Sequence, residues 1–203
     1  MLMVDSTQGR TQATDVEIMS DVAAGDTEAY GSIVNRYRGR LHSFVFRFVN
    51  DRETAEDIVQ ETFLRAFRKR KEYRAIANFS TWLFTIAGNL AKSELRRRKR
   101  WRFLSVHKDD DSDTGFELPD ESYLPDRMTE SSLIDGQIQS AIQSLPANYR
   151  QVILLRDVEG MSYQEIAEII KSPVGTVKSR VNRARLRLQQ KLKLEGRDVG
   201  LEV

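Results

Sequence analysis

Two basic segments carry the side chains best suited to binding chemistry, and the clearer one is near the C-terminal end. Residues 171–193 contain eight Lys or Arg residues and no acid. In the major groove of duplex DNA, Arg and Lys can donate to guanine and Asn can pair with adenine. The segment therefore predicts a helix that reads base edges, with a basic surface helix of a bundle as the alternative. The residues expected to face outward from it are Thr176, Lys178, Ser179, Asn182 and Arg183.

The elements around this segment predict a helix-turn-helix. Ser162 and Glu165 have the spacing of a capping box at the start of a short helix, and residues 171–175 (KSPVG) are typical of a tight turn. A final helix is expected from Thr176, and a narrow apolar face lets it pack on the helix before it. That face consists of Val177, Val181, Ala184 and Leu188. A capped helix, a turn and a basic second helix are the arrangement of a major-groove reader.

The other basic segment combines cations with aromatic rings. A helix capped by Ser80 or Thr81 is expected to run into the basic stretch 96–102 (RRRKRWR). Cations bind phosphates, aromatic faces stack on unpaired bases, and an amide such as that of Asn89 can read a base edge. This favours binding to single-stranded nucleic acid; the alternative is that Trp82 is a core residue and the Arg stretch is solvated. The candidate contact residues are Trp82, Asn89, Lys92, Ser93, Arg96 and Arg97.

A helix is expected to begin at Asp51. One side of it carries an acidic ridge, defined as Asp57, Gln60, Glu61 and Leu64. The spacing i, i+3, i+4, i+7 places these residues on one side of the helix, away from its apolar stripe. Two interpretations remain open. The ridge is either a solvated face with one exposed leucine, which is common, or a docking surface for a basic helix of a partner.

The remaining pattern predicts an all-α protein. Strand-like alternation of Val and Thr is missing, and all four prolines lie at or after Pro119, so the first 118 residues can form long helices. A short helix is expected over residues 15–24, ending at Gly25, and Asp26 is expected to cap a longer one.

An acidic stretch separates the two basic segments. From His107 to Asp135 there are ten acids and two bases, with few apolar residues and no period. The pattern predicts a flexible linker between two small helical domains, although a solvated loop would look similar. The expected division is a first domain over residues 15–102, a linker over 103–131 and a helix-turn-helix domain over 132–193.

The composition of the 203 residues excludes several kinds of chemistry. There is no Cys, and His42 and His107 are the two histidines, so a thiolate site or a multi-His metal site is not expected. Neither a phosphate-binding loop nor a nucleophile elbow is found. We therefore expect a binding protein and not an enzyme, without cofactor or metal. No apolar stretch suits a membrane span and no export signal is seen, so the expected location is the cytoplasm.

These motifs together resemble a known family. Residues 57–67 (DIVQETFLRAF) and 81–91 (TWLFTIAGNLA) resemble region two of bacterial sigma factors, and Leu145-Pro146, YQEIA at 163–167 and PVGTVKSR at 173–180 resemble region four. Both regions in this order in a short chain resemble the extracytoplasmic-function (sigma-E-like) subgroup. The resemblance covers roughly residues 15–193.

The resemblance implies a role for each surface. In this family the acidic ridge docks on the clamp helices of the largest subunit of core RNA polymerase. The segment that includes Trp82 and Asn89 binds the minus-ten promoter element as a melted single strand, and the last helix binds the minus-thirty-five element as duplex. The linker runs through the RNA path of the polymerase, and an anti-sigma factor is an expected partner.

Two other functions fit parts of the pattern. A helix-turn-helix regulator that acts as a dimer would explain the C-terminal half but neither the acidic ridge nor the Trp-plus-Arg segment. An enzyme acting on single-stranded nucleic acid would need a catalytic constellation, and only scattered carboxylates are present.

Overall fold

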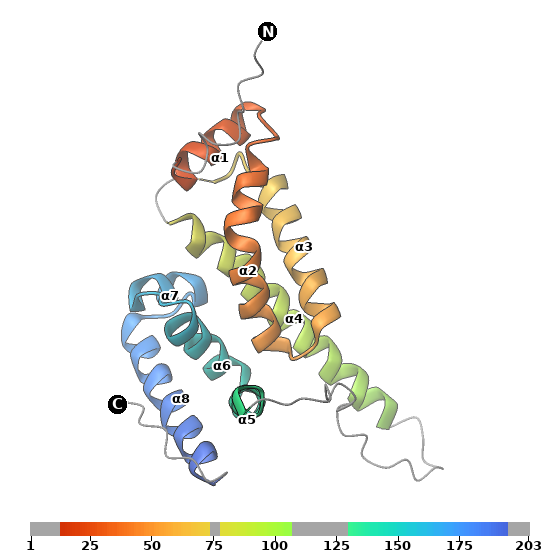
Figure 1. The fold of residues 1–203 in the computed structure, drawn as a ribbon, viewed down its shortest axis with the longest axis vertical. Coiled ribbons are helices and arrows are strands. Elements are labelled where there is room, and N and C mark those ends of the chain that lie inside the picture. Colours follow the sequence, from red (N-terminus) through yellow and green to blue (C-terminus); the bar gives the residue numbers. More distant parts are fainter. Residues whose placement is uncertain (1–12, 74–77, 107–129, 195–203) are drawn as a thin grey trace.

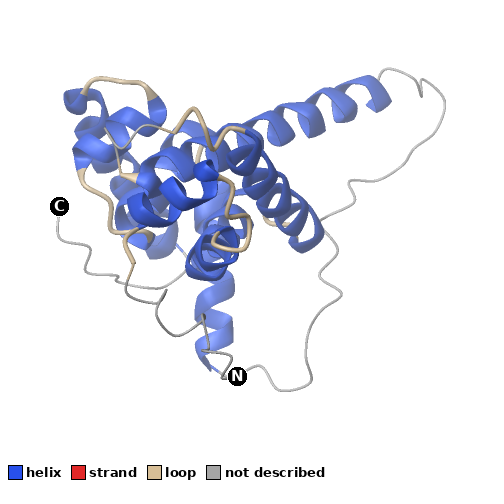
Figure 2. Cartoon of the chain, turned by 90° about the horizontal axis from the view of Figure 1, so that it is seen from above, coloured by secondary structure: helices blue, strands red, loops and turns tan. Residues whose placement is uncertain are grey.

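The computed structural model describes residues 13–73, 78–106 and 130–194, and within these ranges every regular element is helical (Figure 2). This confirms the all-α prediction. The acidic stretch 107–129, predicted as most of the linker, lies outside the described residues. The elements in chain order are α1 (Asp15–Ala24), α2 (Tyr30–Val49), α3 (Arg52–Arg68), α4 (Phe79–Val106), α5 (Glu130–Ser144), α6 (Ala147–Ile153), the π-helix η2 (Leu154–Val158), α7 (Tyr163–Ile170) and α8 (Val174–Leu194).

The ends of α1, α2 and α3 are set by local side-chain chemistry. Helix α1 ends at Gly25, which has φ of 119°, a conformation that glycine adopts without strain. Asp51 caps α3 by accepting from the amide of Thr54 at 2.7 Å, as predicted. The prediction for Asp26 is partly wrong. Its carboxylate accepts from the amides of Glu28 and Ala29, but these belong to a turn, and α2 begins only at Tyr30.

Helix α4 differs from the prediction at both ends. It begins at Phe79, so Ser80 and Thr81 lie in its first turn and do not cap it. The reason is packing, because Phe79 is only 2% exposed among aromatic side chains and starts the helix before the polar pair. The helix then continues to Val106, which places residues 103–106 in a helix and not in the linker.

The C-terminal half contains the predicted helix-turn-helix. Both hydrogen bonds of the capping box between Ser162 and Glu165 are formed at the start of α7. The turn is shorter than predicted, because Lys171 takes the left-handed conformation and α8 already begins at Val174. The π-helix η2 between α6 and Gly160 was not predicted.

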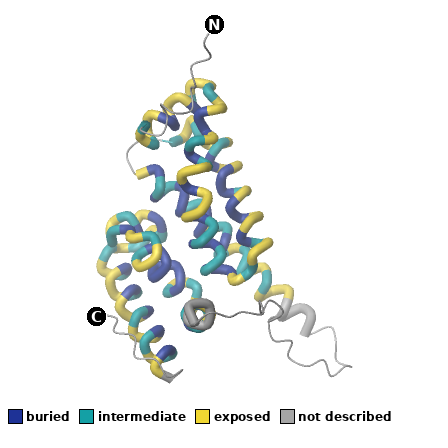
Figure 3. The backbone as a smooth tube through the Cα atoms, viewed as in Figure 1, coloured by how far each residue is buried: buried dark blue, intermediate teal, exposed yellow. Residues whose placement is uncertain are grey.

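Each half is a small helical bundle. Helices α2, α3 and α4 pack on one another, with α1 against α2, and in the second half α8 packs on α5, α6 and α7 (Figure 1). Residues classed as buried recur along the helices of both bundles (Figure 3). No helix within the described ranges combines the length and apolar character needed to cross a membrane.

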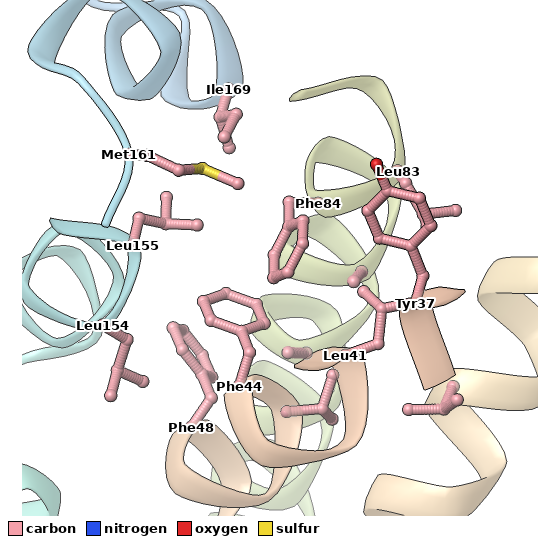
Figure 4. Packing of buried hydrophobic residues seen from close by; sticks show 14 of the residues in the cluster. Tyr37, Leu41, Phe44, Phe48, Leu83, Phe84, Leu154, Leu155, Met161 and Ile169 are labelled. Atoms are coloured by element: carbon pink, nitrogen blue, oxygen red, sulfur yellow. The ribbon is translucent and has the colours of Figure 1, made fainter. Parts of the chain in front are cut away.

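The two halves also pack against each other, which the sequence did not predict. Helix α4 contacts α7, and α2 contacts α5, α6 and η2. Phe44 and Phe84 of the first half face Leu155 and Met161 of the second (Figure 4). All four side chains are at most 4% exposed, so one hydrophobic core continues from the first bundle into the second.

Candidate nucleic-acid and partner interfaces

The acidic ridge lies on the outer face of α3. Asp57, Gln60 and Leu64 are exposed, and Leu64 keeps 50% of its surface in contact with solvent. Glu61 is half-buried and pairs with Arg65 at 2.6 Å. The structure thus brings the four predicted residues together on one surface, with one of the acids held by an ion pair within the same helix.

A groove runs along this ridge between α2 and α3. It has a volume of about 530 Å³. The spacing of Tyr30, Val34 and Phe67 matches the apolar stripes of their helices, so the sequence alone gives no sign that they also form a groove wall. A largely apolar groove with an exposed leucine at its edge can accept the apolar face of a partner helix. The lining residues are Thr27, Tyr30, Val34, Arg38, Val59, Gln60, Phe63, Leu64 and Phe67.

Trp82 belongs to an aromatic cluster at the start of α4. Its ring centroid lies 5.4 Å from that of Tyr73 and 5.8 Å from that of Phe79, and Phe79 in turn contacts Tyr37. Trp82 is half-buried by these contacts. The sequence left open whether Trp82 is a core residue or a binding residue. In the structure it packs on the first bundle and still presents part of its surface.

The rest of the α4 site lies on the following turns. Asn89, Ser93, Arg96 and Arg97 are exposed, and the Ser93 hydroxyl donates to the carbonyl of Asn89. Lys92 is half-buried. Its pKa is lowered by desolvation and then by the nearby charges of Arg96 and of Arg180 on α8. The charge of Arg180 acts on Lys92 because the second half of the chain packs beside α4.

Part of the basic stretch at the end of α4 is structural. Glu94 accepts both guanidinium bonds of Arg97 at 2.8 Å and one from Arg98 at 3.0 Å. Arg98 also pairs with Asp51 at 3.4 Å, at the start of α3. The pair with Asp51 fastens α4 to the start of α3, so Arg98 is a poor candidate for phosphate binding. Arg97 is exposed but already paired with Glu94 within α4.

Helix α8 has a buried apolar face and an exposed polar face. Val177, Val181 and Ala184 are fully buried against the preceding helices. Lys178, Ser179, Asn182 and Arg183 are exposed on the other side, and Thr176 is half-buried between the two faces.

Other cations of α8 hold the helix in place. Arg185 pairs with Asp157 at 2.8 Å, and the Arg187 guanidinium lies 5.0 Å from the ring centroid of Tyr149. These two cations are engaged in packing, whereas the predicted contact residues from Lys178 to Arg183 are exposed. Among the residues that the structure describes, no three His, Asp or Glu side chains converge as a metal site.

The comparisons with known proteins agree with this all-helical, DNA-binding arrangement. Residues 33–101 match the family model of sigma-70 region 2, and residues 135–188 match that of sigma-70 region 4. The RNA polymerase sigma-H factor of Pseudomonas aeruginosa is 35% identical over 177 residues, which cover 86% of this chain and 92% of the relative. The ECF RNA polymerase sigma-E factor of Haemophilus influenzae is 35% identical over 184 residues, covering 89% and 96%.

Solved structures show the same fold. CnrH, in a complex with the cytosolic domain of CnrY, aligns with a TM-score of 0.67 over 90% of this chain and 99% of that one, at 24% identity. The sigma factor RpoE from Bartonella quintana, in a complex with the anti-sigma factor NepR, aligns with a TM-score of 0.62 at 30% identity, covering 82% and 98%.

The fold and the two matched regions define a promoter-recognition factor of the sigma-70 class. The chain belongs to the extracytoplasmic-function group of RNA polymerase sigma factors. It therefore directs promoter-specific initiation of transcription together with RNA polymerase, as a member of a non-enzymatic class of initiation factors.

The pairing of Glu94 makes the stability of the first bundle dependent on pH. The pKa of Glu94 is lowered, first by its hydrogen bond with Arg97, then also by the bond with Arg98, from an ordinary value of 4.5. A lowered pKa in the folded state stabilises the fold above the unfolded pKa, and this stabilisation is lost as pH falls through the folded pKa. We expect Glu94→Gln to be less stable than the parent at pH 7, with the difference shrinking below about pH 4.5.

Urea unfolding at a series of pH values measures this effect. The exposed Glu28→Gln, in the turn before α2, is the control, and its stability should follow that of the parent throughout. A constant difference between Glu94→Gln and the parent down to pH 3 would show that the carboxylate charge is not the cause.

Proposed function

We propose that the acidic ridge and the adjoining groove bind the clamp helices of the largest polymerase subunit. The observation that carries this proposal is the position of Leu64, which is half exposed at the edge of an apolar groove and flanked by Asp57 and Gln60. An amphipathic helix with basic residues beside an apolar stripe would bury Leu64 and place its cations near Asp57. Leu64 itself is not among the side chains that form the hydrophobic core.

Replacing Leu64 by Ser, or Asp57 by Arg, should weaken binding to core RNA polymerase by roughly fivefold or more, because a central contact typically contributes over about 1 kcal/mol. The measurement is affinity for purified core polymerase by fluorescence anisotropy. Asp21→Arg, an exposed acid on α1, is the charge-matched control and should bind as the parent does. Unchanged affinity of both ridge variants, with native helicity, would place the polymerase contact elsewhere.

We propose that α4 binds the minus-ten element as a melted single strand. The exposed amide of Asn89 is suited to one base, and Ser93, Arg96 and Arg97 lie on the following turns beside the sugar–phosphate backbone. Lys92 adds a cation on the same side. Trp82, with one surface packed on Tyr73, has its other surface available for an unpaired base or for the edge of the remaining duplex.

Asn89→Ala should keep polymerase binding but reduce promoter melting by about fivefold to a hundredfold, the loss expected for one base contact of about 1–3 kcal/mol. A template selected from a random library by run-off transcription, with a fluorescent base in its minus-ten element, reports the melting. Asn35→Ala on α2 is an exposed amide control. Equal melting by the parent and Asn89→Ala would remove Asn89 from the base-reading site.

We propose that α8 binds the minus-thirty-five element as duplex, with Lys178, Ser179, Asn182 and Arg183 at base edges and Thr176 at the backbone. The helix presents these side chains on the face opposite its buried valines. This is the geometry by which the second helix of a helix-turn-helix enters the major groove.

Arg183→Ala should lose about 1–3 kcal/mol at one base pair and relax the preference there. Binding of the holoenzyme to a set of single-base variants of the selected promoter measures the loss. Gln190→Ala, exposed further along the same helix, controls for changes in α8 itself. An equal loss on every sequence, with a salt dependence reduced by about one charge, would instead identify a phosphate contact.

The remaining assignments rest on the family. We propose a first domain that extends to the end of α4 at Val106, an acidic linker after it, and a helix-turn-helix domain that begins with α5 at Glu130. We also propose a role for the acidic linker in the RNA path, and binding of an anti-sigma factor, as in the complex of RpoE with NepR. We further propose that the chain has no enzymatic activity and acts in the cytoplasm, where the polymerase and the promoters are. Co-purification with core polymerase separates this function from that of a dimeric regulator or a nuclease.

A further inference from the structure

The last turns of α4 project beyond the rest of the first bundle. Arg98 pairs with Asp51 at the start of α3, at 3.4 Å, and α4 continues past this contact to Val106. The end of α4 accordingly extends past the neighbouring ends of α2 and α3 (Figure 1). The proposed minus-ten site ends at Arg97, so it does not include these projecting turns.

Trp101, on the projecting segment, is the most exposed large hydrophobic side chain among the residues that the structure describes. It is 66% exposed, whereas Leu64 of the acidic ridge is 50% exposed. Packing of the bundle therefore does not account for this side chain. Tryptophan is enriched at binding interfaces, where its ring is covered and its N–H finds an acceptor. Trp101 is thus a candidate for contact with a partner.

The neighbours of Trp101 determine the charge of that partner. Lys99 and Arg100 precede it and are exposed. Glu94 is the one acid of α4, and its carboxylate already accepts hydrogen bonds from two arginines of the same helix. The projecting segment is therefore a cationic surface beside an exposed aromatic ring, and it is complementary to a chain of phosphates.

One face of α4 continues from the proposed base-reading site into the projecting segment. The face starts at Asn89, and positions four, seven and eleven further on lie on the same side at 3.6 residues per turn. These positions hold Ser93, Arg96 and Arg100, which are all exposed. From Asn89 to Arg100 the helix rises by roughly 16 Å, which corresponds to about five base pairs of duplex. The row thus reaches well beyond one base.

Duplex DNA is the form that suits the projecting end. In the proposed function the minus-thirty-five element is duplex and the minus-ten element is melted, so the DNA between them is duplex up to the edge of the melted segment. The start of α4 carries the aromatic cluster of Trp82 and Tyr73, which suits unpaired bases. After Asn89 the described part of α4 has cations but no amide. A stiff duplex holds its phosphates at regular spacing, which a straight row of cations matches.

We propose that the projecting end of α4 binds the duplex between the two promoter elements, next to the minus-ten element. Arg100 contacts a phosphate one helical turn beyond Arg96. The Trp101 ring packs on the adjoining sugar, and its N–H can donate to a phosphate oxygen. These contacts fix the edge of the melted segment without reading its sequence. The inference deepens the proposed function of α4 and rests on it.

Binding of the holoenzyme to two templates tests the proposal. Both carry the minus-ten strand of the selected promoter as a single strand and lack the minus-thirty-five element, and only the first has a short upstream duplex. Arg100→Ala should weaken binding to the first template by about threefold to tenfold and lower its salt dependence by about one charge. Trp101→Ala should weaken the same binding by about fivefold. Neither variant should change binding to the second template.

Two further variants serve as controls. Arg52→Ala on α3, whose side chain is 84% exposed, is charge-matched and should bind both templates as the parent does. Arg100→Lys keeps the cation and should retain most of the binding. Parental binding of Arg100→Ala and Trp101→Ala to the first template would overturn the proposal. So would an equal loss on both templates, because the contact would then be with the melted strand or with polymerase.

Asn89→Ala in the same assay separates this proposal from the proposed function. If Asn89→Ala weakens binding to both templates while Arg100→Ala and Trp101→Ala bind as the parent does, the duplex contact is overturned and the base-reading role stands. If Asn89→Ala binds both templates as the parent does, and Arg100→Ala and Trp101→Ala lose binding to the first alone, the base-reading role fails and the duplex contact stands.

Discussion

The guanidinium of Arg150 is the interaction on which the arrangement of the two halves depends. It is 7% exposed and donates to the Phe48 carbonyl across the interface, and to Gln143 and the Leu145 carbonyl within its own half. Burial lowers its pKa to about 10, so it stays protonated at neutral pH. Breaking a buried charge away from its partners typically costs about 3–5 kcal/mol. Loss of these partners would therefore be costly, which favours the packed arrangement of the two halves.

The charged residues fall into two groups, those that hold helices together and those that stay exposed. Arg98, Arg185 and Arg187 are used to fasten helices within each bundle, through Asp51, Asp157 and the Tyr149 ring. The cations nearest the packing faces are paired by these contacts. Lys178 and Arg183 of α8 remain exposed, on the side away from the buried valines. The net charge of +2 over 203 residues conceals this separation, since the acids that balance the cations lie elsewhere in the chain. Binding surfaces arise here from the charges that folding does not require.

Local rules made much of the fold predictable from the sequence. Asp51 and Ser162 cap their helices through bonds that span three residues, and Gly25 and Gly160 end elements by taking positive φ. Such interactions involve neighbours in the chain, so the residue types reveal them. The acidic ridge and the outward face of α8 were placed by helical period alone, for the same reason.

Long-range packing set the parts that the sequence could not predict. Phe84 is fully buried because Phe44 and side chains of the other half cover it, and no local pattern indicates a partner so far along the chain. Tyr30 is buried and Phe67 is half-buried, yet both also line a groove, since no helix covers that side of α2 and α3 among the described residues. The early start of α4 at Phe79 likewise depends on Tyr37, which is 42 residues away in the sequence.

The interface between the halves combines an apolar centre with one unsatisfied polar group. Its centre has Phe44 and Phe84 against Leu155, and burial of these side chains favours the contact in water. It also buries the Gln151 amide nitrogen, which finds no hydrogen-bond partner among the residues that the structure describes. An unsatisfied buried donor typically costs about 1–3 kcal/mol. The contact is therefore held by apolar burial and by the hydrogen bonds of Arg150, and Gln151 weakens it.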